Sequence, residues 1–399
     1  MPYKGKAPLT ISTIQPCCPG LIIDSISKEE PIFEGGTTSP GYRWGPSDVI
    51  VATLCVKDAR GNALNLVSKR SKQVASRPTS AVAKTNDIAE RMNEANFYLH
   101  YSDYYHGGGV SIPKAWSIKA PQSGSGERGG AVFTMLLSDL CSGSGVSVRG
   151  RPGLKLDYYD TVAAIMYLAD FHSIQWESKD EDGTIFELGG GLDLEDEGGM
   201  DDEGNWGELG DKLATMKSGL LNRVTTGLQR TRKHRTIIHG DFVSSNLAFF
   251  PSSIPDTYSS CAAFDFKKAG RGYGVYDVAV LLCESVDQGL LVRDMREEEF
   301  LAIYFQHLGS CLRARKKPPL PPGYNIQDAT NMYEVCLMLY CSAVASKGKG
   351  AGGDGGGYEY AMWRSRQLVE GLEREAGKGG KELSESAWGN IFMAKYPMR

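Results

Sequence analysis

The stretch HGDFVSSN, residues 239–246, decides the fold prediction for this chain of 399 residues. One apolar run, residues 236–238, precedes it, and a second, residues 247–250, follows it. Both runs are typical of short strands. Two strands of this kind hold a short polar loop rigid between them, so we expect Asp241 and Asn246 to face the same side.

A second acidic residue follows in the sequence and can converge with Asp241 and Asn246. Asp265 comes nineteen residues after Asn246, at the end of the short apolar strand in AAFDF. Phosphoryl transfer uses two carboxylates and one amide, because one carboxylate accepts the proton of the attacking hydroxyl while the other groups hold Mg²⁺. Carboxylate and amide oxygens are the hard ligands that Mg²⁺ prefers. The pattern therefore indicates phosphoryl transfer.

A lysine and a glutamate upstream fit the same chemistry. Lys69 closes the apolar strand LNLVSK, where its ammonium group can reach nucleotide phosphates, and Lys72 is the alternative. Such a lysine needs an anionic partner to fix its position. Glu94 on the following helix is the first candidate, and Glu90, one turn earlier, is the second.

Together these segments resemble a known superfamily. HGDFVSSN is similar to the HxDxxxxN loop of the aminoglycoside phosphotransferase and choline kinase superfamily, in particular its choline-kinase-like and ecdysteroid-kinase-like branch. Four further segments resemble family motifs in the correct order: NEANFYLHY (93–101), IPKAW (112–116), LADFHSIQW (168–176) and GVYDVAVLL (274–282). The resemblance covers roughly residues 50–310.

The resemblance implies an α+β, two-lobed protein-kinase-like fold, with an antiparallel sheet plus a helix in the N-lobe and a mainly helical C-lobe. It implies ATP and Mg²⁺ as cofactors and a small-molecule alcohol as substrate. It also assigns roles to residues of this sequence. Asp241 is the implied base, Asp277 the brace of its loop, and Asn246 and Asp265 the implied Mg²⁺ ligands.

For the nucleotide, the resemblance implies that Lys69 contacts the phosphates and pairs with Glu94. Adenine is expected at the backbone of the connection between the lobes, near Leu137, Ser138, Asp139 and Leu140. Two features depart from the family pattern. Lys267 stands where this branch commonly has glutamine, and the best glycine-rich candidate, residues 34–45 with Gly35, Gly36 and Gly41, has an unusual spacing.

The organisation of the chain follows from composition. We expect a nucleotide-binding lobe over residues 1–140 and a catalytic and substrate lobe over residues 141–399. Residues 177–211 are rich in Asp, Glu and Gly, which predicts a flexible, solvated insertion. GRGYGV, residues 270–275, lacks the final glycine and the preceding strand of a dinucleotide fingerprint, and we interpret it as a turn.

Other classes of function are disfavoured. The formal net charge is −4, and no basic cluster points to nucleic acid. The longest apolar stretch near the end, residues 335–345, is too short to span a bilayer. None of the nine cysteines forms a CxxC pair, so zinc-finger spacing is absent. We expect a cytoplasmic protein, and its oligomeric state cannot be predicted.

Several interpretations remain open. The acceptor could be choline or ethanolamine, an amino sugar or a sterol-like alcohol, and the acidic insertion slightly favours a cationic one. The main alternative is a catalytically dead kinase fold that binds a nucleotide or a partner. A protein kinase is disfavoured because the segment between Asp265 and Asp277 is too short for an activation loop. A partner-binding protein that docks through the acidic insertion is a further alternative.

Overall fold

The computed structural model describes residues 23–31, 49–58, 63–72, 81–119, 132–140, 155–178, 185, 206–230, 233–250, 260–320, 326–346, 359–375 and 395. The chain divides into two compact units. The first contains Met1–Asp103 and Ile112–Ser144, and the second contains Tyr104–Ser111 and Gly145–Arg399. The domain boundary at residue 140 stays a prediction. The candidate glycines 35, 36 and 41 and most of the acidic insertion lie outside the described residues.

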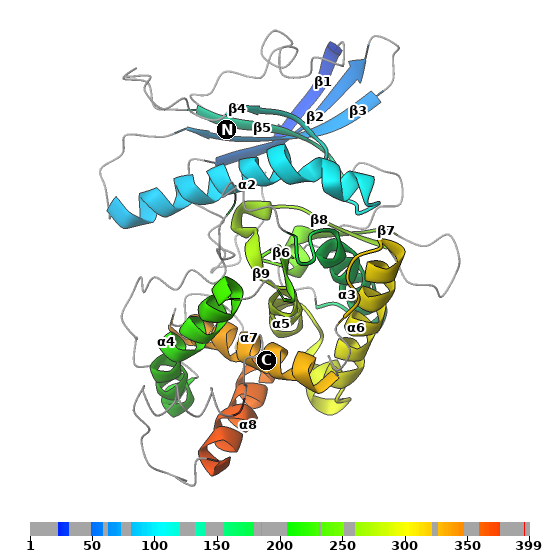
Figure 1. The fold of residues 1–399 in the computed structure, drawn as a ribbon. Coiled ribbons are helices and arrows are strands. Elements are labelled where there is room, and N and C mark those ends of the chain that lie inside the picture. Colours follow the sequence, from blue (N-terminus) through cyan, green and yellow to red (C-terminus); the bar gives the residue numbers. More distant parts are fainter. Residues whose placement is uncertain are drawn as a thin grey trace. The chain divides into compact units, whose positions relative to one another are not determined.

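The first unit contains a five-stranded antiparallel sheet in the order β1-β2-β3-β5-β4. Its strands are β1 (Ile23–Pro31), β2 (Val49–Asp58), β3 (Ala63–Lys72), β4 (Ala115–Lys119) and β5 (Val132–Ser138). The strand LNLVSK predicted from the sequence lies within β3. The second half of β1, KEEP, lacks the apolar alternation of a strand. The long helix α2 (Ala81–Gly107) connects β3 to β4 in sequence (Figure 1).

The second unit is mainly helical, with two small antiparallel strand pairs. Its helices are α3 (Tyr158–Ile174), α4 (Gly207–Arg230), α5 (Val275–Glu284), α6 (Glu297–Ala314), α7 (Ile326–Ser346) and α8 (Glu359–Glu375). The pairs are β6 (Arg235–Ile238) with β9 (Gly270–Tyr273), and β7 (Leu247–Phe250) with β8 (Ser260–Ala263). This arrangement confirms the predicted α+β class, with a sheet plus a helix in one unit and a mainly helical second unit.

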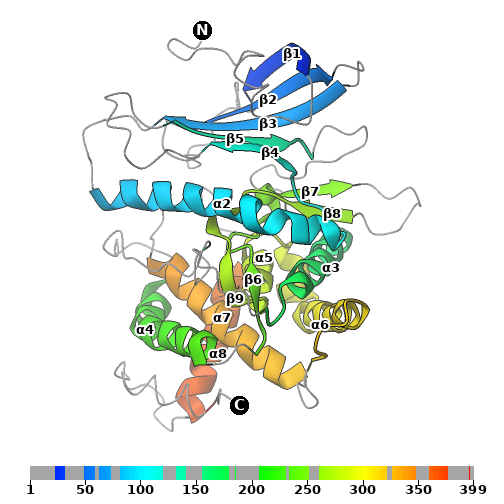
Figure 2. The ribbon, with the colours of Figure 1, turned by 45° about the horizontal axis from the view of Figure 1, so that its top comes forward.

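Helix α5 forms part of the core of the second unit. Every residue from Val275 to Cys283 is buried, as expected for a helix that is apolar on nearly all sides. Helices α3 and α6 lie side by side, and so do α4 and α7 (Figures 1 and 2). The burial of α5 matters for the site because it places one acidic residue, Asp277, inside the core.

The interpretation of residues 270–275 as a turn is wrong for residues 270–273, which form strand β9. The strand pairs with β6 in the register Thr236↔Gly272 and Ile238↔Gly270. A Cβ atom on Gly272 would lie 2.6 Å from the Cδ1 atom of Ile238. Glycine therefore lets the Ile238 side chain cross the neighbouring strand, which is a known role of glycine inside a strand.

Two smaller predictions concern membranes and thiols. Within the described part of the chain, no helix combines the length and apolarity needed to cross a bilayer. The cysteines that the structure describes as free thiols are all buried: Cys261, Cys283, Cys311, Cys336 and Cys341. Burial is usual for free cysteine side chains, which behave as small apolar groups.

Candidate active site

The two strand pairs of the second unit bring the sequence-predicted residues together. Strands β7 and β8 pair with Leu247 opposite Ala263. Asn246 precedes the first of these residues, and Asp265 follows the second by two positions. The amide of Phe264 donates a hydrogen bond to the carbonyl of Asn246 at 3.0 Å, which extends the pairing by one step. Asn246 and Asp265 therefore lie at neighbouring ends of two paired strands.

Gly240 makes the turn that leads to Asp241. Its φ angle is +79°, in the left-handed region that favours glycine. A Cβ atom at this position would collide with the carbonyl oxygen of Lys268. Residue 240 must therefore be glycine for the backbone to pass this close to the segment after Asp265.

Asp277 on α5 braces the loop, as the sequence predicts. Its carboxylate accepts the backbone N–H groups of His239, at 2.6 Å, and Gly240, at 2.9 Å. The Nε2 atom of His172 on α3 lies 3.1 Å from the same carboxylate, and the hydroxyl of Tyr304 on α6 lies 2.9 Å from His172 Nδ1. These buried bonds join α3, α5 and α6 to the loop, so the loop is held from three helices.

His239 is a structural histidine, as expected from the sequence. Its Nε2 atom lies 3.0 Å from the carbonyl of Phe264, and its Nδ1 atom accepts from the backbone N–H of Asp241 at 3.3 Å. A carbonyl can only accept, so Nε2 carries the proton and the ring is neutral. Burial lowers the pKa of His239, which favours the same neutral form.

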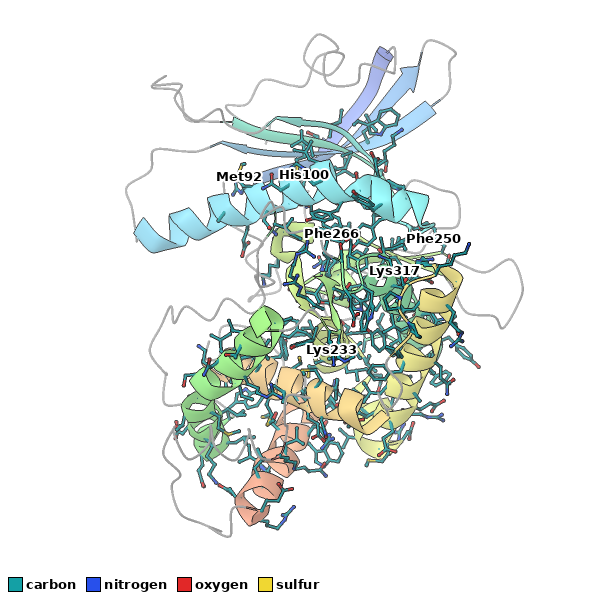
Figure 3. All side chains as sticks on the ribbon, viewed as in Figure 1. Met92, His100, Lys233, Phe250, Phe266 and Lys317 are labelled. Atoms are coloured by element: carbon teal, nitrogen blue, oxygen red, sulfur yellow. The ribbon has the colours of Figure 1, made fainter. Side chains whose placement is uncertain are left out.

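Each of the two loop aspartates is followed by a buried phenylalanine. Phe242 and Phe266 both have no exposed surface. The ring of His239 contacts both of them, with centroids 5.7 and 4.7 Å away. Phe266, labelled in Figure 3, also stacks on Phe171 at 5.8 Å, and both rings are buried. This aromatic packing fixes the backbone beside Asp241 and beside Asp265.

The carboxylates of Asp241 and Asp265 share a cation. Lys267 Nζ lies 3.2 Å from Asp265 Oδ2 and 4.0 Å from Asp241 Oδ2. Lys268 Nζ lies 3.6 Å from Asp241 Oδ1. The side chains of Asp241 and Asp265 are 25% and 17% exposed, so solvent screens these pairs, which are worth about 0–1 kcal/mol each. The lysines can therefore exchange for another cation or move to an anion.

The side chain of Asn246 is oriented by one hydrogen bond. Its Nδ2 atom donates to the backbone carbonyl of Asp241 at 2.8 Å. The carbonyl oxygen of the amide, Oδ1, is therefore the end that can act as a ligand. Together with the Asp265 carboxylate, which Lys267 Nζ contacts at 3.2 Å, it supplies oxygen donors to a cation. The donor set fits Mg²⁺.

Asp265 has an unusual backbone conformation. Its φ and ψ angles of 69° and 58° lie in the left-handed region, which costs a residue with a side chain about 1–3 kcal/mol. Such strain persists where the surroundings demand it, and it is common at functional sites. The position of Asp265 is thus set by its surroundings rather than by local preference.

In the first unit, Lys69 on β3 and Glu94 on α2 form an ion pair. Lys69 Nζ lies 2.7 Å from Glu94 Oε1, and the two side chains are 19% and 4% exposed. The pairing predicted from the sequence is confirmed, and it shows that α2 lies beside the sheet (Figure 2). The side chain of the alternative lysine, Lys72, lies outside the described residues.

The connection expected to meet adenine follows β5. Ser138 exchanges two hydrogen bonds with Lys114, because its N–H donates to the Lys114 carbonyl and its Oγ accepts from the Lys114 N–H, both at 2.8 Å. Ser138, Asp139 and Leu140 are partly exposed, whereas Leu137 is buried. The two hydrogen bonds to Lys114 fix the backbone at Ser138.

Sequence reasoning did not identify Lys268 as part of the site. Its contact with Asp241 depends on the tight approach of the segment 266–268 to Gly240, which is a tertiary feature. The signal in the sequence is the pair of lysines directly after Asp265-Phe266.

The comparisons with known proteins support the class that this site indicates. Residues 197–316 match the model of the ecdysteroid kinase-like family. The matched segment contains the Asp241 loop, Asp265 and Asp277, and it confirms the resemblance for this part of the chain. Residues before 197, including Lys69 and Glu94, lie outside the match. No curated protein matches the chain.

Two solved structures of small-molecule kinases are similar to this chain at low sequence identity. An ethanolamine kinase from Plasmodium vivax is 12% identical, with 88% of this chain and 80% of that chain covered and a TM-score of 0.40. The GDP complex of wild-type aminoglycoside 2'-phosphotransferase-IIIa is 13% identical, with 96% of each chain covered and a TM-score of 0.38.

Proposed function

We propose that this protein is an ATP-dependent phosphotransferase that moves the γ-phosphate of ATP to a hydroxyl group of a small molecule. The observation that carries the proposal is that Asp241, in the loop between β6 and β7, meets Asn246 and Asp265 at paired strand ends, with Asp277 holding the loop by two backbone hydrogen bonds. The family match over residues 197–316 supports the same reaction class.

Asp241 acts as the base in this proposal. Its carboxylate is partly exposed, so an alcohol can approach it, and it accepts the hydroxyl proton as the oxygen attacks phosphorus. Lys268 and Lys267 contact the carboxylate and orient it before substrate arrives. During transfer their ammonium groups stabilise negative charge on the phosphoryl oxygens.

Asn246 and Asp265 hold Mg²⁺, which when bound neutralises charge on the nucleotide phosphates. The role of the first unit rests on the sequence resemblance. There Lys69, oriented by Glu94, contacts the phosphates, and the backbone of Ser138, Asp139 and Leu140 meets adenine. A cytoplasmic location remains part of the proposal.

The acceptor is a small alcohol such as choline or ethanolamine, an amino sugar or a sterol-like alcohol. The acidic composition of residues 177–211 favours an acceptor that carries an amine or a quaternary ammonium group. Turnover of neutral or anionic alcohols alone would remove this preference and leave the reaction class intact.

The test is ADP release from Mg²⁺-ATP across these alcohols, with the Asp241→Asn variant beside the native protein. The native protein should show a rate that the correct alcohol stimulates. Asp241→Asn should lose about 10²–10⁴-fold in that rate while still binding nucleotide, because only the proton acceptor is removed. Asp294→Asn, an exposed aspartate of the same unit, is the control and should keep the native rate.

The two negative outcomes have different meanings. Nucleotide binding without ADP release for any alcohol would favour the alternative, a kinase fold that binds nucleotide or a partner and has lost catalysis. Absence of nucleotide binding in the native protein would reject the proposal.

A further inference from the structure

Three side chains of metal-binding type meet between helices α3 and α6. Asp170 lies on α3, and His307 and Cys311 lie on α6, four residues apart and so on one helix face. One ligand atom from each lies within 4.8 Å of the others. His307 Nε2 is 3.1 Å from Asp170 Oδ2, and Cys311 Sγ is 3.1 Å from Asp170 Oδ1.

These separations suit a tetrahedral ion. Bonds of about 2.0–2.3 Å from zinc to oxygen, nitrogen and sulfur place neighbouring ligand atoms roughly 3.3–3.8 Å apart. His307 and Cys311 each lie 3.1 Å from Asp170, one at each carboxylate oxygen, and one ligand atom of each residue lies within 4.8 Å of the others, so side-chain rotations would complete the geometry. Asp170 and His307 are partly exposed and Cys311 is buried, so a cation reaches the first two directly from solvent.

The charges of the cluster also suit a cation. Burial opposes ionisation of Asp170, but hydrogen bonds from His307 and Cys311 and the charge of Arg315 hold its pKa below the ordinary value. The carboxylate is therefore an anionic ligand at neutral pH. Burial and the adjacent Asp170 raise the pKa of the Cys311 thiol to about 12, so a metal has to displace the thiol proton.

The guanidinium group of Arg315 competes with a metal ion for the Asp170 carboxylate. Its Nη2 atom lies 3.4 Å from Asp170 Oδ1 but only 2.9 Å from the carbonyl of Gly108. The shorter bond anchors the guanidinium group on Gly108, so Asp170 can turn to a cation without releasing Arg315 from the backbone. The positive charge of Arg315 nevertheless weakens the binding of any cation here.

We propose that Asp170, His307 and Cys311 bind one Zn²⁺ ion, with a water molecule as the fourth ligand. Imidazole and thiolate are good ligands for Zn²⁺ and poor ones for Mg²⁺, so this site is chemically distinct from the Asn246 and Asp265 pair. Binding through Nε2 moves the imidazole proton of His307 to Nδ1. Binding through sulfur releases the Cys311 proton to solvent, one proton per ion.

The position of the site gives it a consequence for the Asp241 loop. His172 and Tyr304, which carry the hydrogen-bond chain to Asp277, lie on the same two helices. On α3, His172 follows Asp170 by two residues. On α6, Tyr304 precedes His307 by three residues. An ion that links α3 to α6 therefore stabilises the helix pair that supports the brace. Zinc should raise the melting temperature of the protein.

The test is calorimetric titration of the chelator-treated, full-length protein with Zn²⁺. We expect one tight site in the native protein. Loss of an outer-shell partner costs about 10–100-fold in metal affinity, so loss of a ligand in Cys311→Ser or His307→Gln should cost at least about 100-fold. Cys261→Ser is the control, because Cys261 has the same 6% exposure as Cys311 and should leave the tight site intact.

Two further measurements test the Zn²⁺ proposal if Cys311→Ser or His307→Gln fails to fold. Arg315→Gln removes the positive charge beside Asp170, so it should bind Zn²⁺ more tightly than the native protein. Co²⁺ in place of Zn²⁺ should give a thiolate charge-transfer band in the native protein. Absence of that band, or equal Zn²⁺ affinity in the native protein and Cys311→Ser, would overturn the proposal.

Discussion

At the scale of single residues, Gly240 is the position where the Asp241 loop is most sensitive to change. We predict that Gly240→Ala destabilises the protein by about 1–3 kcal/mol from backbone strain alone, with a further cost from the collision with the Lys268 carbonyl. The measurement is the urea midpoint of unfolding. The loop would also move, so nucleotide turnover should fall.

Gly309→Ala is the matched control for this prediction. Gly309 lies inside α6, and a Cβ there meets the side chains of Arg313 and Leu320 at 3.7 Å, an ordinary contact. Alanine should stabilise this helix by about 0.5–1 kcal/mol. Equal changes in unfolding free energy for Gly240→Ala and Gly309→Ala would show that the turn at Gly240 does not require glycine.

The residues of the site were predictable to different degrees for a physical reason. Asp241, Asn246 and Asp265 sit at strand ends, and short strands with fixed spacing can be recognised in a sequence. Asp277 was predicted as the brace from its place in a family motif, and its hydrogen bonds confirm that role. Lys268 was not predicted, because its contact with Asp241 depends on packing.

At the scale of elements, α6, α7 and α8 are tied by a buried polar network. Arg364 on α8 donates to Glu297 on α6 and to Glu334 on α7, at 2.9–3.0 Å. Tyr360 also donates to Glu297, at 2.7 Å, and its hydroxyl lies 2.7 Å from that of Tyr333. Its members come from distant parts of the sequence, so no local pattern indicates the network.

We predict that Glu297→Gln lowers the unfolding free energy by on the order of 3 kcal/mol, because it leaves part of the charge of Arg364 buried and unbalanced. Glu298→Gln changes the next residue of the same helix, which is exposed, and should stay within about 0.5 kcal/mol of the native protein. Thermal or urea unfolding measures both. A loss of less than about 1 kcal/mol at Glu297 would show that the network adds little to stability.

The two short strands around the Asp241 loop were predictable from their apolar runs. Two other strands were not, for clear causes. Strand β1 carries charged residues in its second half, and β9 contains glycines that signal a turn in isolation. Both strands form because a partner strand is available, β2 for the first and β6 for the second. Tertiary pairing overrides local preference at these positions.

At the scale of the whole molecule, the proposed reaction draws on residues of both units. Asp241, Asn246 and Asp265 belong to the second unit, and the Lys69–Glu94 pair belongs to the first. The family match covers the second unit only in part, over residues 197–316. A test of the reaction as a whole therefore has to include a variant from each unit.

The most direct measurement follows the label of γ-labelled ATP in the presence of Mg²⁺ and the alcohol that stimulates turnover. The account predicts label in a phosphate ester of the alcohol with the native protein, and little or none with Asp241→Asn or Lys69→Met. Label that stays on ATP with every alcohol, or that appears only as inorganic phosphate, would contradict transfer to a hydroxyl group. Native-like transfer by Asp241→Asn would contradict the assigned base.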